Sequence, residues 1–234
     1  MAEKLLIPSI EKNLSSLIEF QRRKEREASH NDSTKHTKPT ITISREFGCE
    51  AFPMAERLKE IMEKRTGEQW LLMEKKLLGE VARNHNLSEN ILQGLGEKSR
   101  FLDEILATFS PRWKSEKDHF RFLCRHIVAL ATQGNVILMG RGSAFITRPM
   151  KNCTHFRMYA SAEFKIRSVR HRLDVSAEEA ERVIAREQKL RDHFIRDFLD
   201  RDAHDLSVYN LVFNNDLNSA DKGAHTIMEY VLGS

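Results

Sequence analysis

The segment that most constrains the fold is Ile41-Thr-Ile-Ser-Arg-Glu-Phe-Gly48, a β-branched run that stops at a glycine turn. Cys49-Glu-Ala-Phe-Pro-Met-Ala55 follows it and opens an amphipathic helical pattern. A strand that passes through a turn into a helix is how a parallel α/β domain begins. Such a turn can also bind phosphate, because backbone N–H groups and the helix N-terminus point to one spot. An ordinary first strand and helix without a ligand is the alternative for this segment.

Strands and helices continue to alternate along the chain. Asn135-Val-Ile-Leu-Met139 is a fully apolar run, which is typical of a strand buried on both faces of a sheet. The predicted strands are residues 40–44, 70–73, 135–139, 155–159 and 209–213. This alternation predicts a parallel sheet with right-handed crossovers, in which a ligand binds at the carboxyl ends of the strands.

The domain organisation follows from the helical patterns and one polar segment. The predicted parts are an N-terminal helix (1–29), a linker (30–39), and a domain (40–234) with helices at 53–66 and 221–232, a helical insert (about 74–132) and a basic helical pair (about 161–200). Ser161 and Ser176 are the predicted N-caps of the pair. The apolar stripe of the N-terminal helix packs either on the domain or on a second copy of the chain, as a homodimer.

Composition excludes several classes of protein. The net charge of +4 fits phosphate-bearing small ligands or a weak preference for nucleic acid. Three widely spaced cysteines, without a CxxC pair or a Cys/His metal spacing, predict reduced thiols, a cytoplasmic location and no protein-bound metal. No signal peptide is expected, and no run reaches the roughly 18 apolar residues of a membrane span.

Four features in this order resemble the cytidylate-kinase-like family of P-loop proteins. They are Ile41–Gly48, the turn Gly140-Arg-Gly-Ser143, the basic helical pair and Tyr209-Asn-Leu-Val-Phe-Asn214. The resemblance covers residues 40–232. It implies a three-layer parallel α/β sheet of the P-loop nucleoside-kinase type, in which the helical insert and a basic lid close over the nucleotides. The implied activity is phosphoryl transfer from ATP, with Mg²⁺, to CMP or a related monophosphate.

The resemblance also implies roles for individual residues. The donor-phosphate site would contain Ser44, Arg45, Gly48 and Cys49, and the acceptor site would contain Arg141 and Gly142. The implied lid residues are Arg167, Arg170, Arg186, Lys189 and Arg191. Arg141, Arg186 and Arg191 would be catalytic, and Asn214 would contact the base or ribose. The alternatives are a surface ion pair of Arg45 with Glu46 or Glu50, a tie from Arg141 to a nearby carboxylate, and a solvated, charge-laced lid helix.

The phosphate loop departs from the family pattern. It has no GxxxxGK[ST] sequence, so it lacks the lysine for the β- and γ-phosphates and the Ser or Thr for Mg²⁺. Glu50 would also place a negative charge beside a polyphosphate. Two functions therefore stay open: an ATP-dependent cytidylate kinase, and a degenerate member that binds a nucleotide or a partner protein. A nucleic-acid-binding module is disfavoured, because residues 165–191 contain no aromatic side chain.

Overall fold

We describe residues 19–20, 38–74 and 116–233 of the 234-residue chain in a computed structural model. Most of the predicted insert (75–115), most of the N-terminal helix and nearly all of the linker lie outside these residues. The proposed homodimer through the N-terminal helix therefore stays a prediction. Phe20 is described, and it is buried against the core of the same chain.

The centre of the fold is a parallel sheet of five strands in the order β2-β3-β1-β4-β5. The strands are β1 (Thr40–Arg45), β2 (Leu71–Met73), β3 (Val136–Met139), β4 (Cys153–Tyr159) and β5 (Leu211–Asn214). All four pairs of neighbouring strands are parallel. The predicted parallel α/β sheet is therefore confirmed, and its strands lie within two residues of the predicted bounds.

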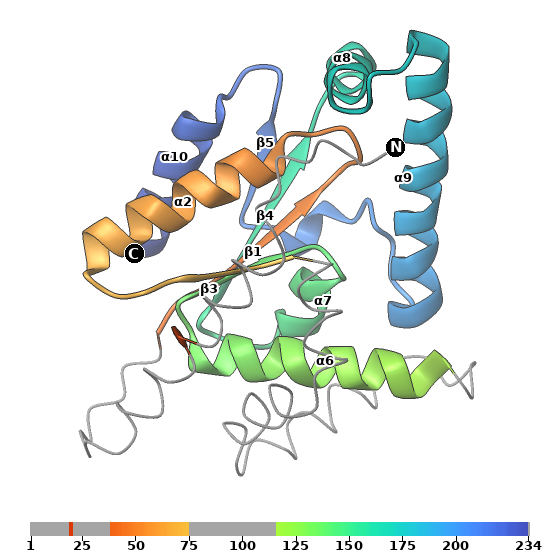
Figure 1. Ribbon diagram of the computed structural model, residues 1–234. Helices are drawn as coiled ribbons and strands as arrows, with labels where there is room; N and C mark the ends of the chain where they lie inside the picture. Colours follow the sequence, from red (N-terminus) through yellow and green to blue (C-terminus); the bar gives the residue numbers. More distant parts are fainter. Residues whose placement is uncertain (1–18, 21–37, 75–115, 234) are drawn as a thin grey trace, which may run out of the picture.

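Helices cover both faces of this sheet, as Figure 1 shows. One face carries α2 (Ala51–Thr66) and α10 (Ala220–Leu232), and the other carries α6 (Glu116–Gln133) and α7 (Ser143–Thr147). The basic pair consists of α8 (Ala162–Leu173) and α9 (Ala177–Leu199), followed by a 3₁₀ turn, η2 (Leu206–Val208). Ser161 and Ser176 cap α8 and α9 as predicted, accepting from the N–H groups of Phe164 and Glu179. None of the described helices is long and apolar enough to cross a membrane, and the cytoplasmic location stays a prediction.

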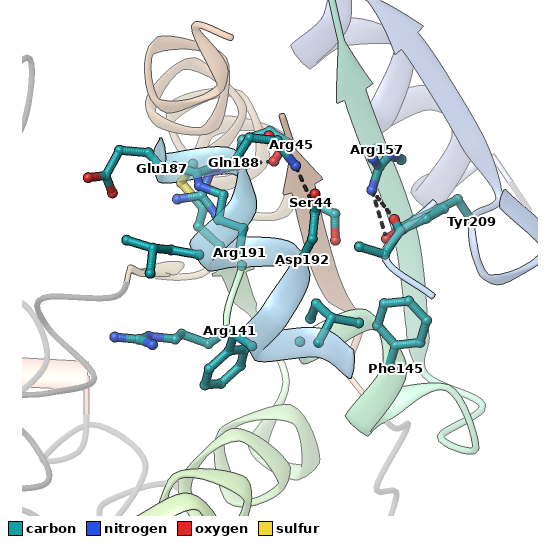
Figure 2. Close-up of a pocket in the computed structure, with 17 residues that line it drawn as sticks. Ser44, Arg45, Arg141, Phe145, Arg157, Glu187, Gln188, Arg191, Asp192 and Tyr209 are labelled. Atoms are coloured by element: carbon teal, nitrogen blue, oxygen red, sulfur yellow. Dashed lines mark hydrogen bonds between the residues drawn. The ribbon is translucent and has the colours of Figure 1, made fainter. Parts of the chain in front are cut away.

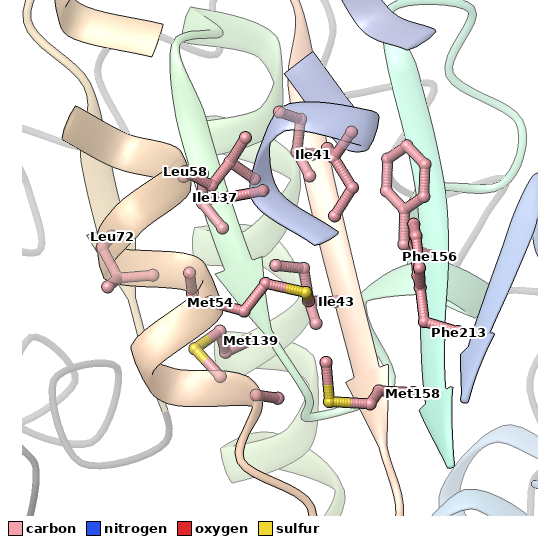
Figure 3. Close-up of a cluster of buried hydrophobic side chains, with 14 of the residues drawn as sticks. Ile41, Ile43, Met54, Leu58, Leu72, Ile137, Met139, Phe156, Met158 and Phe213 are labelled. Carbon is pink, nitrogen blue, oxygen red and sulfur yellow. The ribbon is translucent and has the colours of Figure 1, made fainter. Parts of the chain in front are cut away.

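Apolar side chains of the strands contribute to a core on each face of the sheet, and those of β2 and β3 contribute to both cores. In β3, Ile137 and Met139 face α2 and α10, whereas Val136 and Leu138 face α6 and α7. Figure 3 shows the first of these cores, in which side chains of β1, β3 and β4 meet those of α2. This alternation explains why the run is apolar throughout.

On the face covered by α6 and α7, β1 and one position of β4 carry polar side chains. The Thr40 hydroxyl donates to the carbonyl of Ala131 over 3.0 Å, and Thr42 Oγ1 is hydrogen bonded to His155 Nδ1 at 2.9 Å. All three of these polar side chains are buried. Burial lowers the pKa of His155 from 6.5 to about 4, with a further contribution from the positive charge of Arg148. His155 is therefore neutral in the folded protein at neutral pH.

The neutral state of His155 predicts acid sensitivity. Between about pH 6.5 and 4 the unfolded chain binds a proton at His155 that the folded chain does not bind. The free energy of unfolding should therefore decrease as the pH falls through this window, by on the order of 3 kcal/mol from this group. Urea unfolding at several pH values measures the effect. His155→Gln should flatten the pH dependence, whereas His204→Gln, at an exposed position, should retain it. Equal slopes for the two variants would contradict the assignment.

Candidate anion-binding site

A cavity of about 180 Å³ opens at the carboxyl ends of β1 and β3, under α9. Figure 2 shows its lining side chains. Five elements or loops supply the side chains used below: the end of β1, the loop after β3, β4, α9 and the segment around η2. The lining includes Ser44, Arg45, Gly140, Arg141, Gly142, Phe145, Arg157, Glu187, Gln188, Arg191, Asp192, Phe194 and Tyr209. Such crevices at strand ends are where α/β sheets bind ligands.

The loop after β3 has an unusual backbone. Gly140, Arg141 and Gly142 all have positive φ, at +72°, +55° and +71°. A left-handed conformation costs roughly 1–2 kcal/mol at a residue with a Cβ, so Arg141 is held in a strained position. A Cβ on Gly140 would overlap the guanidinium of Arg45, and one on Gly142 would overlap Leu199. The two glycines therefore let the chain pass close to both neighbours while it presents Arg141 to the cavity.

Gly140→Ala should lower the phosphate affinity of the site more than it lowers the stability of the fold. The added methyl group must displace the Arg45 guanidinium, and the positive φ adds strain of about 1 kcal/mol. We expect a severalfold loss of affinity for inorganic phosphate, measured by calorimetry, with a small loss of thermal stability. Gly67→Ala is a matched control, because Gly67 has a φ of +68° and a Cβ there would meet no heavy atom within 4 Å. Equal phosphate affinities for the two variants would contradict this role of Gly140.

Three of the arginines carry positive charge that no carboxylate of the described chain neutralises directly. Within that part of the chain, Arg45, Arg141 and Arg191 form no ion pair. Burial, together with the charge of Arg191, lowers the pKa of Arg45 to about 9, and Glu74 opposes the shift. Burial also lowers the pKa of Arg141 and of Arg191. All three groups are still protonated at neutral pH, and a bound anion would offset the cost of their lost hydration.

Two of these arginines are held in place by the chain itself. Arg191 donates from Nη1 to the carbonyl oxygen of Arg45 over 3.1 Å, and its guanidinium lies 5.1 Å from the centre of the Phe47 ring. Arg141 lies 5.2 Å from the centre of the Phe194 ring, on α9. Cation–π contacts of this kind orient a guanidinium while its N–H groups stay available to a ligand.

The loop between β1 and α2 uses its own N–H groups for contacts within the protein. The N–H of Phe47 donates to Gln188 Oε1 over 2.8 Å, and that of Glu50 donates to Asn215 Oδ1 over 2.8 Å. The N–H of Cys49 points to the carbonyl of Glu46 at 3.4 Å. These donors include the ones that a phosphate would use at a strand–loop–helix turn.

A lysine fills the space beside the same loop. A Cβ on Gly48 would lie 2.7 Å from Cβ of Lys165, so the α8 backbone packs against the glycine. Lys165 Nζ forms an ion pair with Glu46 over 2.8 Å. The described loop therefore does not fit the phosphates of Mg²⁺–ATP, since three of its N–H donors are used, Lys165 fills the space beside Gly48, and the loop has no lysine or hydroxyl for them. No group of three His, Cys, Asp or Glu side chains in the described ranges could hold a metal ion.

The structure brings together five of the residues implied by the resemblance. They are Ser44, Arg45, Arg141, Gly142 and Arg191, and all line the cavity. The surface ion pair considered for Arg45 is wrong: among the described residues Arg45 pairs with neither Glu46 nor Glu50, and Glu46 pairs with Lys165. The carboxylate tie considered for Arg141 is likewise absent from the described residues.

The other implied residues lie away from the cavity lining. Gly48 and Cys49 belong to the packed loop, and burial raises the pKa of the Cys49 thiol to about 12, so it stays protonated. Arg167 and Arg186 are exposed and pair with Glu163 and Glu187. Arg170 and Lys189 are also exposed, and Asn214 Oδ1 accepts from the N–H of Asp216 in the turn after β5. For these lid positions the structure matches the solvated, charge-laced helix.

The lining residues that were not predicted from the sequence include Arg157, Gln188 and Tyr209. Arg157 carried a usable signal, because a charged side chain inside a predicted buried strand needs a partner or a ligand. Tyr209 was part of a motif that carries the family resemblance, but it was given no role. Gln188 carried no signal, because the sequence does not say what a lone amide on a helix contacts.

Comparison with known proteins gives the family and the fold. The family model described as the cytidylate kinase-like family matches residues 40–217. The crystal structure of an uncharacterized protein from Eubacterium ventriosum ATCC 27560 is 19% identical, covers 84% of this chain and 99% of its own, and has a TM-score of 0.65. It supports the fold alone.

Two kinases were also found at lower structural similarity. Shikimate kinase from Bacteroides thetaiotaomicron is 12% identical over 84% of this chain and 99% of its own, with a TM-score of 0.38. Dephospho-CoA kinase from Campylobacter jejuni is 12% identical over 83% and 98%, with a TM-score of 0.35. No curated protein matches the chain. The family model spans most of the sequence and includes β1, the loop after β3 (residues 140–142) and α9. The chain therefore belongs to the cytidylate kinase-like family.

Proposed function

We propose that this protein binds a nucleotide and holds its phosphate between Arg45, Arg141 and Arg191. The observation that carries the proposal is the convergence of these three guanidinium groups, without ion pairs among the described residues, on one cavity at the strand ends. A planar guanidinium matches phosphate oxygens in a bidentate contact, so three of them favour a phosphate over a monovalent anion. Membership of the family supports a nucleotide, such as CMP or another monophosphate, as the class of ligand.

We further propose that the protein is a catalytically degenerate member of the family. This proposal is supported by the loop between β1 and α2, whose N–H groups at Phe47 and Glu50 already donate to Gln188 and Asn215. A triphosphate in that loop would have to displace both side chains and the Lys165 stem. We therefore expect one nucleotide site for each chain, at the arginines.

ATP-dependent transfer to CMP is the second candidate. It is favoured by Arg141 and Arg191, which line one cavity and for which the family resemblance implies catalytic roles. Phosphoryl transfer depends mainly on positioning and on neutralising charge, which arginines supply. For this candidate, α9 would have to leave the loop, breaking the contact between Gln188 and Phe47. The Mg²⁺ would arrive with ATP.

Competition calorimetry separates the two candidates. The purified chain is titrated with CMP and the other monophosphates, then with Mg²⁺–ATP, and then with each in the presence of the other. The degenerate site predicts saturable binding at one nucleotide for each chain and mutual exclusion of monophosphate and ATP. Simultaneous binding of both, with formation of ADP and a nucleoside diphosphate, would support the kinase instead. Absence of any nucleotide binding at millimolar concentrations would contradict both.

A further inference from the structure

Helix α9 contacts the loop between β1 and α2 with the same side chains that line the cavity. The amide oxygen of Gln188 accepts from the N–H of Phe47 over 2.8 Å. Three residues later, Arg191 donates to the carbonyl of Arg45 over 3.1 Å. Both side chains line the cavity, as Figure 2 shows. Because residues three apart on a helix share a face, a movement of α9 would change both contacts together.

A second contact fixes the orientation of the Gln188 amide. Its Nε2 donates over 2.8 Å to Oδ1 of Asp192, on the next turn of α9. An ionised carboxylate can only accept, so it binds the nitrogen of the amide and leaves the oxygen directed to Phe47. Gln188 is therefore positioned to occupy an N–H donor of the loop.

Helix α8 binds the same loop. Lys165 Nζ pairs with Glu46 over 2.8 Å, and Arg172 donates from Nη2 to the carbonyl of Gly48 over 3.3 Å. Together with α9, the basic pair thus contacts each of the four consecutive residues 45–48 through one of its side chains. Two helices that bind every residue of a segment in this way can act as a clamp on it.

A neighbouring donor of the loop is held by a different part of the chain. The N–H of Glu50 donates over 2.8 Å to Oδ1 of Asn215, which directly follows β5. If α8 and α9 moved away, the N–H of Phe47 would lose its acceptor, whereas that of Glu50 would keep its own. The two amides therefore distinguish movement of the basic pair from unfolding of the whole loop.

We infer that α8 and α9 form an autoinhibitory clamp, which an anion bound at the arginines of the cavity tightens on the loop between β1 and α2. The inference rests on the proposed phosphate site and goes beyond it by coupling that site to the loop. Arg191 reaches the anion only while α9 is docked, so the ligand shifts the population toward the docked state. By linkage, saturating phosphate suppresses opening by the same factor by which docking raises phosphate affinity. An occupied arginine site therefore closes the loop to a second anion.

Amide hydrogen exchange of the full natural chain, with inorganic phosphate as the probe, tests the clamp. Saturating phosphate should slow exchange at the N–H of Phe47 by at least about tenfold, and should change exchange at that of Glu50 by less than about twofold. In Gln188→Ala, the N–H of Phe47 should exchange rapidly both with and without phosphate. Lys189→Ala is the matched control and should behave as the natural protein does, because Lys189 is exposed on α9 and does not line the cavity.

The outcomes separate the clamp from the function on which it rests. Phosphate that binds by calorimetry but leaves exchange at Phe47 unchanged would overturn the clamp and leave the proposed site standing. Equal slowing at Phe47 and Glu50 would overturn it too, because it would indicate general stabilisation of the fold. So would a folded Gln188→Ala protein in which phosphate still protects the N–H of Phe47. Absence of phosphate binding would overturn the proposed site itself, and with it the inference.

Discussion

Replacing Arg191 with alanine should lower the affinity of the protein for a nucleoside monophosphate by about 100-fold. The reason is that removal of one partner from a desolvated charge pair costs about 2–5 kcal/mol. Arg191 lines the cavity from α9, and burial already lowers its pKa, so the group gains strongly from a bound anion. It also ties α9 to β1 through the carbonyl of Arg45. Titration calorimetry with CMP measures the affinity.

Two control variants make this result specific. Arg191→Lys keeps a charge but loses the planar fork, so we expect an intermediate loss of affinity. Arg182→Ala removes an exposed arginine of the same helix and should leave the affinity unchanged. If Arg191→Ala remained folded and bound CMP as tightly as the Arg182→Ala control, the proposed site would be wrong.

Replacing Phe156 with alanine should lower the free energy of unfolding by about 3–5 kcal/mol, the usual cost of removing a buried aromatic side chain. Phe156 lies in β4 with none of its surface exposed. Its ring centre is 6.2 Å from that of Phe213 in β5 and 5.8 Å from that of Tyr230 in α10, so it joins the sheet to the helical layer. The cavity left by the ring would lie between rigid elements that cannot easily close it.

Urea unfolding of Phe156→Ala measures this cost. Leu217→Ala removes a large apolar side chain that is 75% exposed, and it should change the free energy of unfolding by less than about 0.5 kcal/mol. A loss below about 1.5 kcal/mol for Phe156→Ala would mean that this core tolerates a cavity, contrary to its close packing.

The fold was predictable where local sequence carries the information. The apolar run that includes Val136–Met139 is a strand because its alternate side chains fill two different cores. Ser161 and Ser176 cap their helices because a serine hydroxyl can accept from an N–H three residues later. The short helix α7 (Ser143–Thr147) was missed, because five residues are too few to show a helical period.

The candidate site was predictable only in part. Arg45 and Arg141 could be located because both follow predicted strands, where parallel sheets gather their ligands. The use of the loop donors could not be foreseen, because Phe47 meets Gln188 and Glu50 meets Asn215 at separations of 141 and 165 residues. Arg157 was overlooked although a charge inside a predicted strand was a usable signal, and its place opposite Ser44 follows only from the pairing of β4 with β1.

A crystal structure of the protein grown with CMP tests most directly whether the arginines hold the nucleotide phosphate. We expect the phosphate within hydrogen-bonding distance of Arg45, Arg141 and Arg191, while Gln188 still accepts from the N–H of Phe47. A phosphate bound to the N–H groups of Gly48–Ala51, with Gln188 and Asn215 displaced, would contradict the proposed site. It would show that the loop between β1 and α2 binds the phosphate instead.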